Sequence, residues 1–325
     1  MKQTVAVIYG GRSGEHEISI RSAKAIKEGL DRDRYDVVDY FIDPDGRWSP
    51  EAILPEPGAQ PDIDVVFPIL HGTFGEDGTV QGLLELADLP YVGAGVMASA
   101  VSMDKEMMKR ICVERGLPVV EYIIMPRQAL DAQAVADRFT YPVFVKPANL
   151  GSSVGISKVH HRGELEAALQ LAAEFDRKVI VERGITGREF ECGVLGNEEP
   201  VASLPCEVLP SKEFYDYEDK YLLDRAQFKL PAELPEEQMT RLRRLAVDCY
   251  RAVGCEGMAR VDFLLETETG ELFLNEINTI PGFTSISMYP KMWEHSGIAF
   301  SALLDRLIEL AVERHKAKKA TRFTR

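Results

Sequence analysis

The stretch ARVDFLLETETGELFLNEINTIPG, residues 259–282, consists of two apolar-rich segments on either side of the turn ETETG. With that turn at its centre, Asp262 lies opposite Glu276 and Arg260 lies opposite Asn278. Residues two apart on a strand share a face, so these four side chains are expected to project from one surface. The sequence therefore predicts a β-hairpin that gathers two carboxylates, an amide and a guanidinium.

The side chains of this hairpin suit a site for metal and phosphate. Asp262, Glu276 and Asn278 carry the oxygen ligands that magnesium prefers, and the neighbouring Arg260 suits phosphate oxygens. An isolated pair of this kind is more often a cross-strand salt bridge on a solvated face. The glycine-containing loop PGFTSIS follows directly, and it favours the metal–phosphate interpretation.

A second phosphate signal is VFVKPANLGSSVGIS, residues 143–157, in which Lys146 ends an apolar strand before a glycine- and serine-rich turn. Backbone N–H groups and the hydroxyls of Ser152 and Ser153 can surround a phosphate while a lysine neutralises its charge. Most such turns are only turns, and the spacing is not that of a P-loop. Lys105 is another candidate cation, although a lysine on a helix surface is usually solvated.

The first glycine segment, GGRSGEHEIS, follows an apolar run but lacks the spacing of a dinucleotide-binding turn. Its Glu15 would repel a phosphate and attract an ammonium group, unless it serves only as an acid at a helix start. His71 opens a second glycine segment, HGTFGEDGTVQG. A histidine in a loop is more often solvated than catalytic, so His71 is only a candidate.

Length and composition restrict the class of protein. The 325 residues suffice for two or three packed units, and 45% hydrophobic residues predict a soluble globular chain. A formal charge of −14 argues against nonspecific nucleic-acid binding. The five cysteines show no C-x-x-C spacing, which predicts reduced thiols. No apolar run approaches the roughly 18 residues of a membrane span, so we expect a cytoplasmic protein.

Three units are predicted along the chain. Residues 1–102 should form an α/β layer with mostly parallel strands, and residues 44–61 within it a Pro-rich surface loop. Residues 103–185 should form a small α+β unit, whose first helix has Ser102 as a plausible N-cap. Residues 186–325 contain the hairpin, two helices and the segment FYDYEDKY.

Seven motifs together resemble the D-alanine–D-alanine ligases of the ATP-grasp superfamily, from about residue 4 to the terminal helix. They occur in the family's order: GGRSGEHEIS, HGTFGEDGTVQG, SMDK, FVKPANLGSSVGISKV, EFYDYEDKY, ARVDF and NEINTIPGFTSIS. The resemblance implies a fold of α/β and α+β class, the three-domain ATP-grasp architecture with an N-terminal parallel α/β domain. It also implies that ATP phosphorylates the carboxylate of one D-alanine, that the amine of a second attacks, and that the dipeptide serves peptidoglycan synthesis.

The resemblance assigns roles to individual residues and implies a homodimer. Five residues would be catalytic: Glu15, Ser152, Tyr221, Arg260 and Gly282. The D-alanines would be bound by Glu15, His71, Arg260, Gly282 and Ser287. The nucleotide would be bound by Lys105, Lys146, Ser152, Ser153, Glu182 and Arg183 as the adenine hinge, Glu189 at the ribose, and Lys220. Two Mg²⁺ or Mn²⁺ ions would be held by Asp262, Glu276 and Asn278.

By the same resemblance, FYDYEDKY lies in a lid over the active site, at about residues 209–229. Lys220 would face the transferring phosphate, and Tyr221 would join Ser152 and Glu15 in a hydrogen-bonded set. Relatives that make D-alanyl-D-lactate can carry Phe at this position, so Tyr221 favours an amine nucleophile and the dipeptide. The alternatives are a D-alanine–D-lactate or D-alanine–D-serine ligase, another ATP-grasp enzyme, and an inactive nucleotide-binding module.

Overall fold

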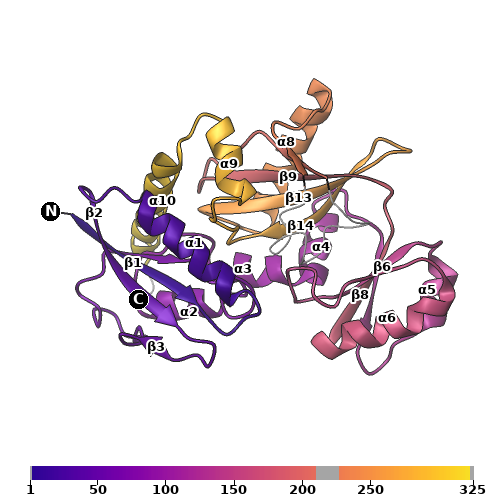
Figure 1. Ribbon diagram of the computed structural model, residues 1–325, viewed down its shortest axis with the longest axis horizontal. Coiled ribbons are helices and arrows are strands. Elements are labelled where there is room, and N and C mark those ends of the chain that lie inside the picture. Colours follow the sequence, from indigo (N-terminus) through magenta and orange to yellow (C-terminus); the bar gives the residue numbers. More distant parts are fainter. Residues whose placement is uncertain (1, 210–226, 323–325) are drawn as a thin grey trace.

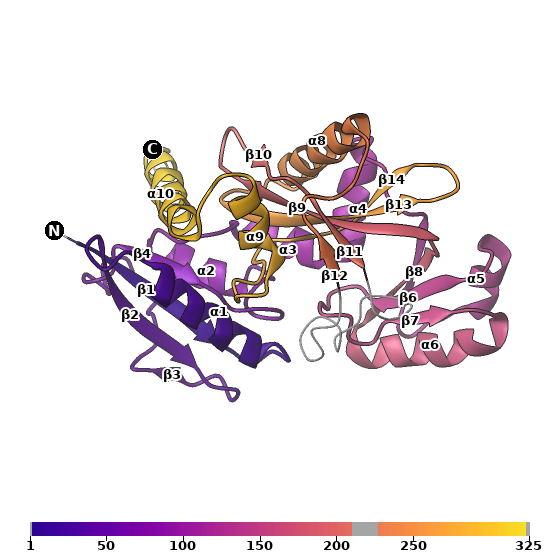
Figure 2. The same cartoon turned by 45° about the horizontal axis from the view of Figure 1, so that its top comes forward.

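In the computed structural model, which describes residues 2–209 and 227–322, the chain forms three lobes, each built on its own β-sheet. The N-terminal lobe and the small central lobe lie at opposite ends, and the C-terminal sheet lies between them (Figures 1 and 2). This mixed architecture of several sheets and flanking helices confirms the predicted fold class.

The N-terminal lobe contains a four-stranded sheet that is parallel except at one edge. The strand at that edge is a short one within the predicted Pro-rich loop, and it pairs antiparallel with its neighbour. The other strands are parallel, as the sequence predicted. In spatial order the strands are β3 (Trp48–Ser49), β2 (Tyr35–Ile42), β1 (Gln3–Gly10) and β4 (Val65–Pro68).

Helices cover both faces of this sheet because successive residues of the central strand point to opposite sides. Val7 belongs to a core that includes side chains of α1 (His16–Gly29) and α10 (Phe300–Lys319). Ile8 belongs to the core on the other face, beneath α2 (Thr79–Leu86). The last helix of the chain thus packs against its first strands.

The central lobe is an antiparallel sheet with helices on one face. Val179 and Val181 belong to the core beneath those helices, so Glu182 lies on the opposite face of the sheet. Its helices are α5 (Ala132–Arg138) and α6 (Arg162–Phe175). Its strands, in spatial order, are β5 (Tyr122–Pro126), β8 (Lys178–Arg183), β6 (Val143–Pro147) and β7 (Ser157–Val159).

The C-terminal sheet contains the hairpin predicted for residues 259–282. Arg260 pairs with Asn278 and Asp262 pairs with Glu276, so the predicted register is confirmed. A register shift follows Asp262. The strands are antiparallel, in the order β12 (Gln227–Lys229), β11 (Cys206–Leu209), β9 (Gly187–Leu195), β13 (Met258–Glu266) and β14 (Leu272–Asn278), with β10 (Val201–Ala202) beside β9.

Two helices pack across the predicted unit boundaries. The buried face of α4 (Lys105–Glu114) belongs to the core of the C-terminal sheet, together with α3 (Val96–Met103) and α8 (Glu236–Ala252). The sequence had placed α4 in the central unit, residues 103–185. Likewise α10, in the third predicted unit, packs on the N-terminal sheet. The unit ranges therefore stay a prediction, while the helices connect the three cores.

The start of α4 differs from the prediction. Asp104, not Ser102, is the N-cap, because its carboxylate accepts hydrogen bonds from the backbone N–H groups of Glu106 and Met107. Ser102 instead lies near the end of α3. A cap displaced by two residues places Lys105 in the first turn of α4, where its side chain is buried.

Two predictions about the chain as a whole can be compared with the structure. All five cysteines are buried and free, as the absence of a C-x-x-C spacing predicted. No helix in the described ranges is both long and apolar enough to cross a membrane.

Candidate active site

A cavity of about 500 Å³ lies where the N-terminal lobe, the glycine loop of the central lobe and the C-terminal sheet meet. It is lined by residues that are distant in sequence and were predicted separately. The predicted residues that line it are Glu15, His71, Lys105, Ser152, Arg260, Glu276, Asn278, Gly282 and Ser287.

Not every predicted residue that the structure describes lines this cavity. Lys220 and Tyr221 fall outside the described residues, so their predicted roles remain predictions. The predicted lid is described only at its ends, where β11 and β12 pair antiparallel. Six predicted site residues that the structure describes do not line the cavity: Lys146, Ser153, Glu182, Arg183, Glu189 and Asp262.

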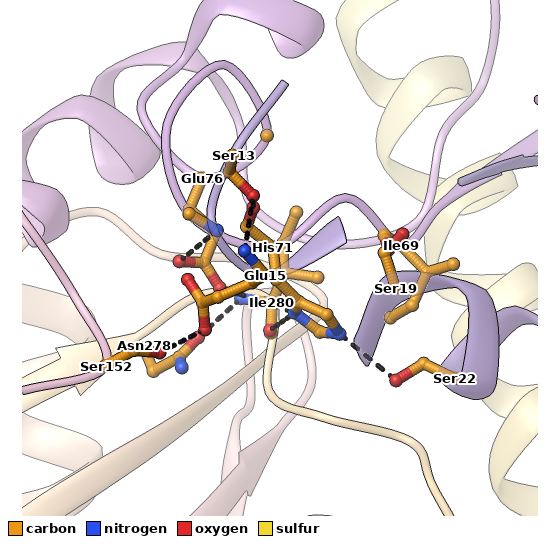
Figure 3. A network of polar contacts seen from close by, with 12 residues as sticks. Ser13, Glu15, Ser19, Ser22, Ile69, His71, Glu76, Ser152, Asn278 and Ile280 are labelled. Atoms are coloured by element: carbon orange, nitrogen blue, oxygen red, sulfur yellow. Dashed lines mark hydrogen bonds and ion pairs between the residues drawn. The ribbon is translucent and has the colours of Figure 1, made fainter. Parts of the chain in front are cut away.

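Glu15 connects the N-terminal lobe to the glycine loop. The Ser152 hydroxyl donates a hydrogen bond to its carboxylate, in a contact shown in Figure 3. Ser152 and Ser153 have φ angles of 54° and 59°, in the left-handed region that non-glycine residues rarely adopt. Gly72 has a φ of 74°, a left-handed conformation that favours glycine, and a Cβ there would lie 2.7 Å from Glu15 Oε2.

His71 is buried and joins two lobes, rather than being solvated. Its Nδ1 lies 3.1 Å from the carbonyl oxygen of Ile280, and its Nε2 lies 3.1 Å from the Ser22 hydroxyl (Figure 3). Burial disfavours the charged imidazole, but Glu76, 3.7 Å away, and the charge of Glu15 outweigh this and raise the pKa of His71. His71 therefore fixes the loop after β14 against the N-terminal lobe.

Arg260, Asp262 and Glu191 form what we call the arginine cluster. Arg260 donates from Nε and Nη2 to the two carboxylate oxygens of Asp262, both at 2.7 Å. Glu191 of β9 stands opposite Asp262, and its Oε1 lies 3.4 Å from Arg260 Nε. Burial opposes the charge of Arg260, yet the neighbouring acids raise its pKa further above the ordinary value.

The predicted metal ligands fit a hard cation in the chemistry of their donors. Asp262 and Glu276 face each other on β13 and β14, and Asn278 contributes an amide oxygen on the same face. Within the described ranges, no group of three or more His, Cys, Asp or Glu residues could hold a metal ion. The predicted ligand set therefore depends on the amide of Asn278 as its third member.

Gly282 and Ser287 lie together at the start of α9 (Met288–His295). Ser287 is the N-cap residue, as predicted for a helix start, and its Oγ accepts a 3.0 Å hydrogen bond from Thr284 N–H. A Cβ at Gly282 would lie 2.7 Å from Ser287 Oγ. Glycine at 282 therefore leaves room for its backbone to approach the Ser287 side chain.

Lys109, Glu182 and Lys146 form a second buried group, which we call the lysine cluster. Glu182 Oε2 lies 2.5 Å from Lys146 Nζ, and Glu182 Oε1 lies 2.7 Å from Lys109 Nζ. Burial alone would raise the pKa of Glu182, but the two lysines outweigh it and lower the pKa to about 2. The Glu182 carboxylate is thus held between two ammonium groups.

Two further predicted nucleotide residues have partners of their own. Lys105 Nζ donates to the carbonyl oxygen of Leu150 at 2.8 Å and lies 3.9 Å from Glu276 Oε2, at the edge of the cavity. Arg183 donates to Glu266 at 2.5 Å, which connects the end of β8 to the hairpin turn. Lys105 therefore bridges the glycine loop and the metal-ligand face.

Three charged residues of this region were not predicted from the sequence. Lys109 follows Lys105 by four residues, a spacing that places both on one helix face. Glu191 follows Glu189 by two residues and so shares its strand face. Glu76 lies in the same glycine segment as His71. These spacings indicate that each residue lies near a predicted site residue, but none of them indicates which side chain it contacts.

The comparisons with known proteins agree with this arrangement. The family described as "D-ala D-ala ligase C-terminus" matches residues 111–309, and "D-ala D-ala ligase N-terminus" matches residues 4–62 and 51–94. The D-alanine–D-alanine ligase of Solibacter usitatus is 70% identical over the full length of both chains. That of a Thermoanaerobacter species is 50% identical over 98% of each chain.

Solved structures show the same fold. The D-alanine–D-alanine ligase from Coxiella burnetii has a TM-score of 0.87 and 39% identity, covering 98% of this chain and 96% of that one. The VanG D-Ala:D-Ser ligase from Enterococcus faecalis has a TM-score of 0.88 and 37% identity, covering 96% and 100%. With both family models and full-length relatives in agreement, the chain belongs to the D-alanine–D-alanine ligase family.

Proposed function

We propose that the protein joins two D-alanine molecules at the expense of ATP to form D-alanyl-D-alanine for peptidoglycan synthesis. The observation that carries this is the cavity itself. An acid suited to an ammonium group, Glu15, shares it with Arg260 and Gly282, which suit a developing oxyanion. Membership of the family implies the use of ATP, and the 70% identical relative carries the name of this ligase.

The reaction explains why such groups are needed. A carboxylate is a poor acyl donor, so an oxygen of the first D-alanine attacks the γ-phosphorus of ATP and ADP leaves. The second D-alanine loses a proton from its ammonium group, and the free amine then attacks the carbonyl carbon of the acyl phosphate. Inorganic phosphate leaves with the shared oxygen and takes up the proton that the amide nitrogen gives up. The task of the protein is to position the reactants and to stabilise charge.

In this proposal each described side chain has a definite task. Glu15, oriented by Ser152, binds the ammonium group of the first D-alanine. The guanidinium of Arg260 and the backbone N–H of Gly282 stabilise the tetrahedral oxyanion. Ser287, at the start of α9, binds the carboxylate of the second D-alanine, which the N–H groups of a helix start also favour.

Asp262, Glu276 and Asn278 would hold Mg²⁺ or Mn²⁺ in this site. Their oxygen donors and their common face suit such ions. When bound, the ions neutralise phosphate charge. Lys146, Ser153, Glu182 and Arg183 of the central lobe, and Glu189 of β9 in the C-terminal sheet, would contact the nucleotide, and none of them lines the 500 Å³ cavity.

Phosphate release tests the proposal directly. We expect release from ATP and Mg²⁺ with D-alanine as sole amino acid, and D-alanyl-D-alanine as the product by mass spectrometry. The VanG relative makes D-serine the relevant competitor, and D-lactate tests the predicted role of Tyr221. Folded protein that releases no phosphate with D-alanine alone would contradict the proposed function, and faster release when D-serine is added would favour the serine ligase.

The predicted homodimer and the cytoplasmic location belong to the same proposal. The chain has a mass of 36.3 kDa, so light scattering should give about twice that value for a dimer. A value near one chain mass at the concentration of the assay would contradict the homodimer without affecting the proposed reaction.

A further inference from the structure

Lys109 is the most deeply buried cation of the described chain that the proposed function does not use. Its side chain is 0% exposed, although lysine is almost never fully buried unless it is paired. It lies on the face of α4 that includes Met108 and Cys112, both in the core of the C-terminal sheet. With no exposed surface, Lys109 cannot contact a ligand, so any effect on one must pass through its partner.

That partner, Glu182, belongs to a different lobe. Glu182 lies on β8 of the central sheet, and its carboxylate joins Lys109 on α4 to Lys146 on β6. Figure 2 shows α4 next to the central lobe that carries β6 and β8. The lysine cluster therefore crosses the boundary between the C-terminal core and the central sheet.

The charges of the lysine cluster do not balance. Two ammonium groups share one carboxylate, and within the described ranges no second acid lies within 4.0 Å of Lys109 or Lys146. Glu276 and Glu189 act on Lys146 from farther away. In a site with little water, an excess positive charge favours the binding of an anion.

We infer that Lys109 is a positioning residue for the nucleotide: by compensating Glu182, it leaves the positive charge of Lys146 available to a phosphate group. Without Lys109, Glu182 and Lys146 form a neutral pair, in which the carboxylate competes with the phosphate for the same ammonium group. This role rests on the proposed nucleotide site, because Lys146 is the proposed phosphate contact.

Replacing Lys109 should weaken the binding of the phosphate groups of a nucleotide more than the binding of its nucleoside. Lys109→Met should weaken the binding of ADP by about tenfold more than the binding of adenosine, which has no phosphate. The ADP-to-adenosine ratio, that is, the dissociation constant of ADP divided by that of adenosine, measured by calorimetry at fixed Mg²⁺, should therefore rise by about tenfold. In turnover assays the KM for ATP should rise more than kcat falls.

Lys178→Met is the matched control. Lys178 also lies on β8 and also reaches α4, where its Nζ donates to Asp104 at 2.5 Å and to Glu106 at 2.8 Å. Its replacement removes one positive charge and one connection between the same two elements, but it leaves Glu182 with both lysines. The ADP-to-adenosine ratio should stay within about twofold of the wild-type value.

A double variant tests the same inference even if Lys109→Met folds poorly. Lys109→Met combined with Glu182→Gln removes the buried acid together with the cation that compensates it, so Lys146 keeps its charge without a competitor. The ratio should return to within about threefold of the wild-type value.

Three results would overturn the inference: an unchanged ratio in Lys109→Met, an equal rise of the ratio in Lys178→Met, or a ratio in the double variant as high as that in Lys109→Met. A structural role alone would affect ADP and adenosine alike. If the wild-type protein binds no ADP at all, the proposed function fails, and the inference fails with it.

Discussion

The lysine cluster and the arginine cluster are both buried ion groups, but their surplus charges are opposite. The first has two lysines around Glu182, and the second has two acids around Arg260. Burying an uncompensated charge is costly, so each cluster gains from a ligand of the opposite sign. The surplus cation suits phosphate, and the surplus acid suits a metal ion or an ammonium group.

The two clusters are also assembled differently. Asp262, Glu191 and Arg260 lie on adjacent strands of one sheet, whose hydrogen bonds fix their spacing. The lysine cluster combines one helix residue with two strand residues of another lobe, and it exists only when the lobes dock. Movement between lobes would therefore change the lysine cluster and leave the arginine cluster intact.

The largest expected effect is that of Arg260→Ala. Removing the guanidinium leaves the buried Asp262 and Glu191 without their shared cation and removes the proposed stabilisation of the oxyanion. We expect kcat to fall by about 10²–10³-fold or more, while ADP still binds, because the lysine cluster is unchanged. Steady-state phosphate release and calorimetry measure the two quantities.

Arg306→Ala provides the comparison for Arg260→Ala. Arg306 is a partly exposed arginine of α10 that pairs with Glu313 at 2.8 Å. It should change neither kcat nor ADP affinity measurably. Near-normal turnover in Arg260→Ala would show that the arginine cluster does not stabilise the transition state.

Glu182→Gln should have the next largest effect, on stability. The pKa of Glu182 is lowered to about 2 from 4.5, so its ionised form stabilises the folded state. The contribution is fully present above pH 4.5 and is lost as the pH falls towards 2. A shift of this size corresponds to roughly 3 kcal/mol at neutral pH.

Denaturant unfolding of both proteins from pH 7 to pH 3 measures this contribution. The deficit of Glu182→Gln in the free energy of unfolding should be largest at pH 7 and should shrink below pH 4.5. A deficit that does not depend on pH would mean that the charge of Glu182 is not what stabilises the lysine cluster.

The difference in assembly also explains how much of the site could be predicted. The hairpin was predicted with its register because a short turn and a period of two determine which residues face each other. Arg260, Asp262, Glu276 and Asn278 were found on one face for that reason alone. Such local geometry can be read from a sequence without knowledge of the rest of the fold.

The lysine cluster could not be predicted in the same way. A lysine in the middle of a helix is usually solvated. Lys109 lies on α4, which packs in the core of the C-terminal sheet, whereas Glu182 lies on β8 of the central sheet. Their approach depends on the docking of α4 on the central sheet, which no local pattern encodes. The wrong N-cap, Ser102, has a related cause, since Ser and Asp both cap helices and only the hydrogen bonds of Asp104 decide between them.

The smallest expected effect is that of Glu266→Gln, which tests whether burial causes the large effects. Glu266 and Arg183 are 2.5 Å apart, as close as Glu182 and Lys146, but the Arg183 side chain is 32% exposed. Water screens such a pair, so the loss in the free energy of unfolding should stay below about 1 kcal/mol. The loss should shrink further in about 0.5 M salt, where the Debye length falls to about 4 Å and screens the pair more strongly. A loss as large as that of Glu182→Gln would show that close contact alone, without burial, determines the cost of breaking an ion pair in this protein. The surplus charges of the two buried clusters would then not require a ligand of the opposite sign.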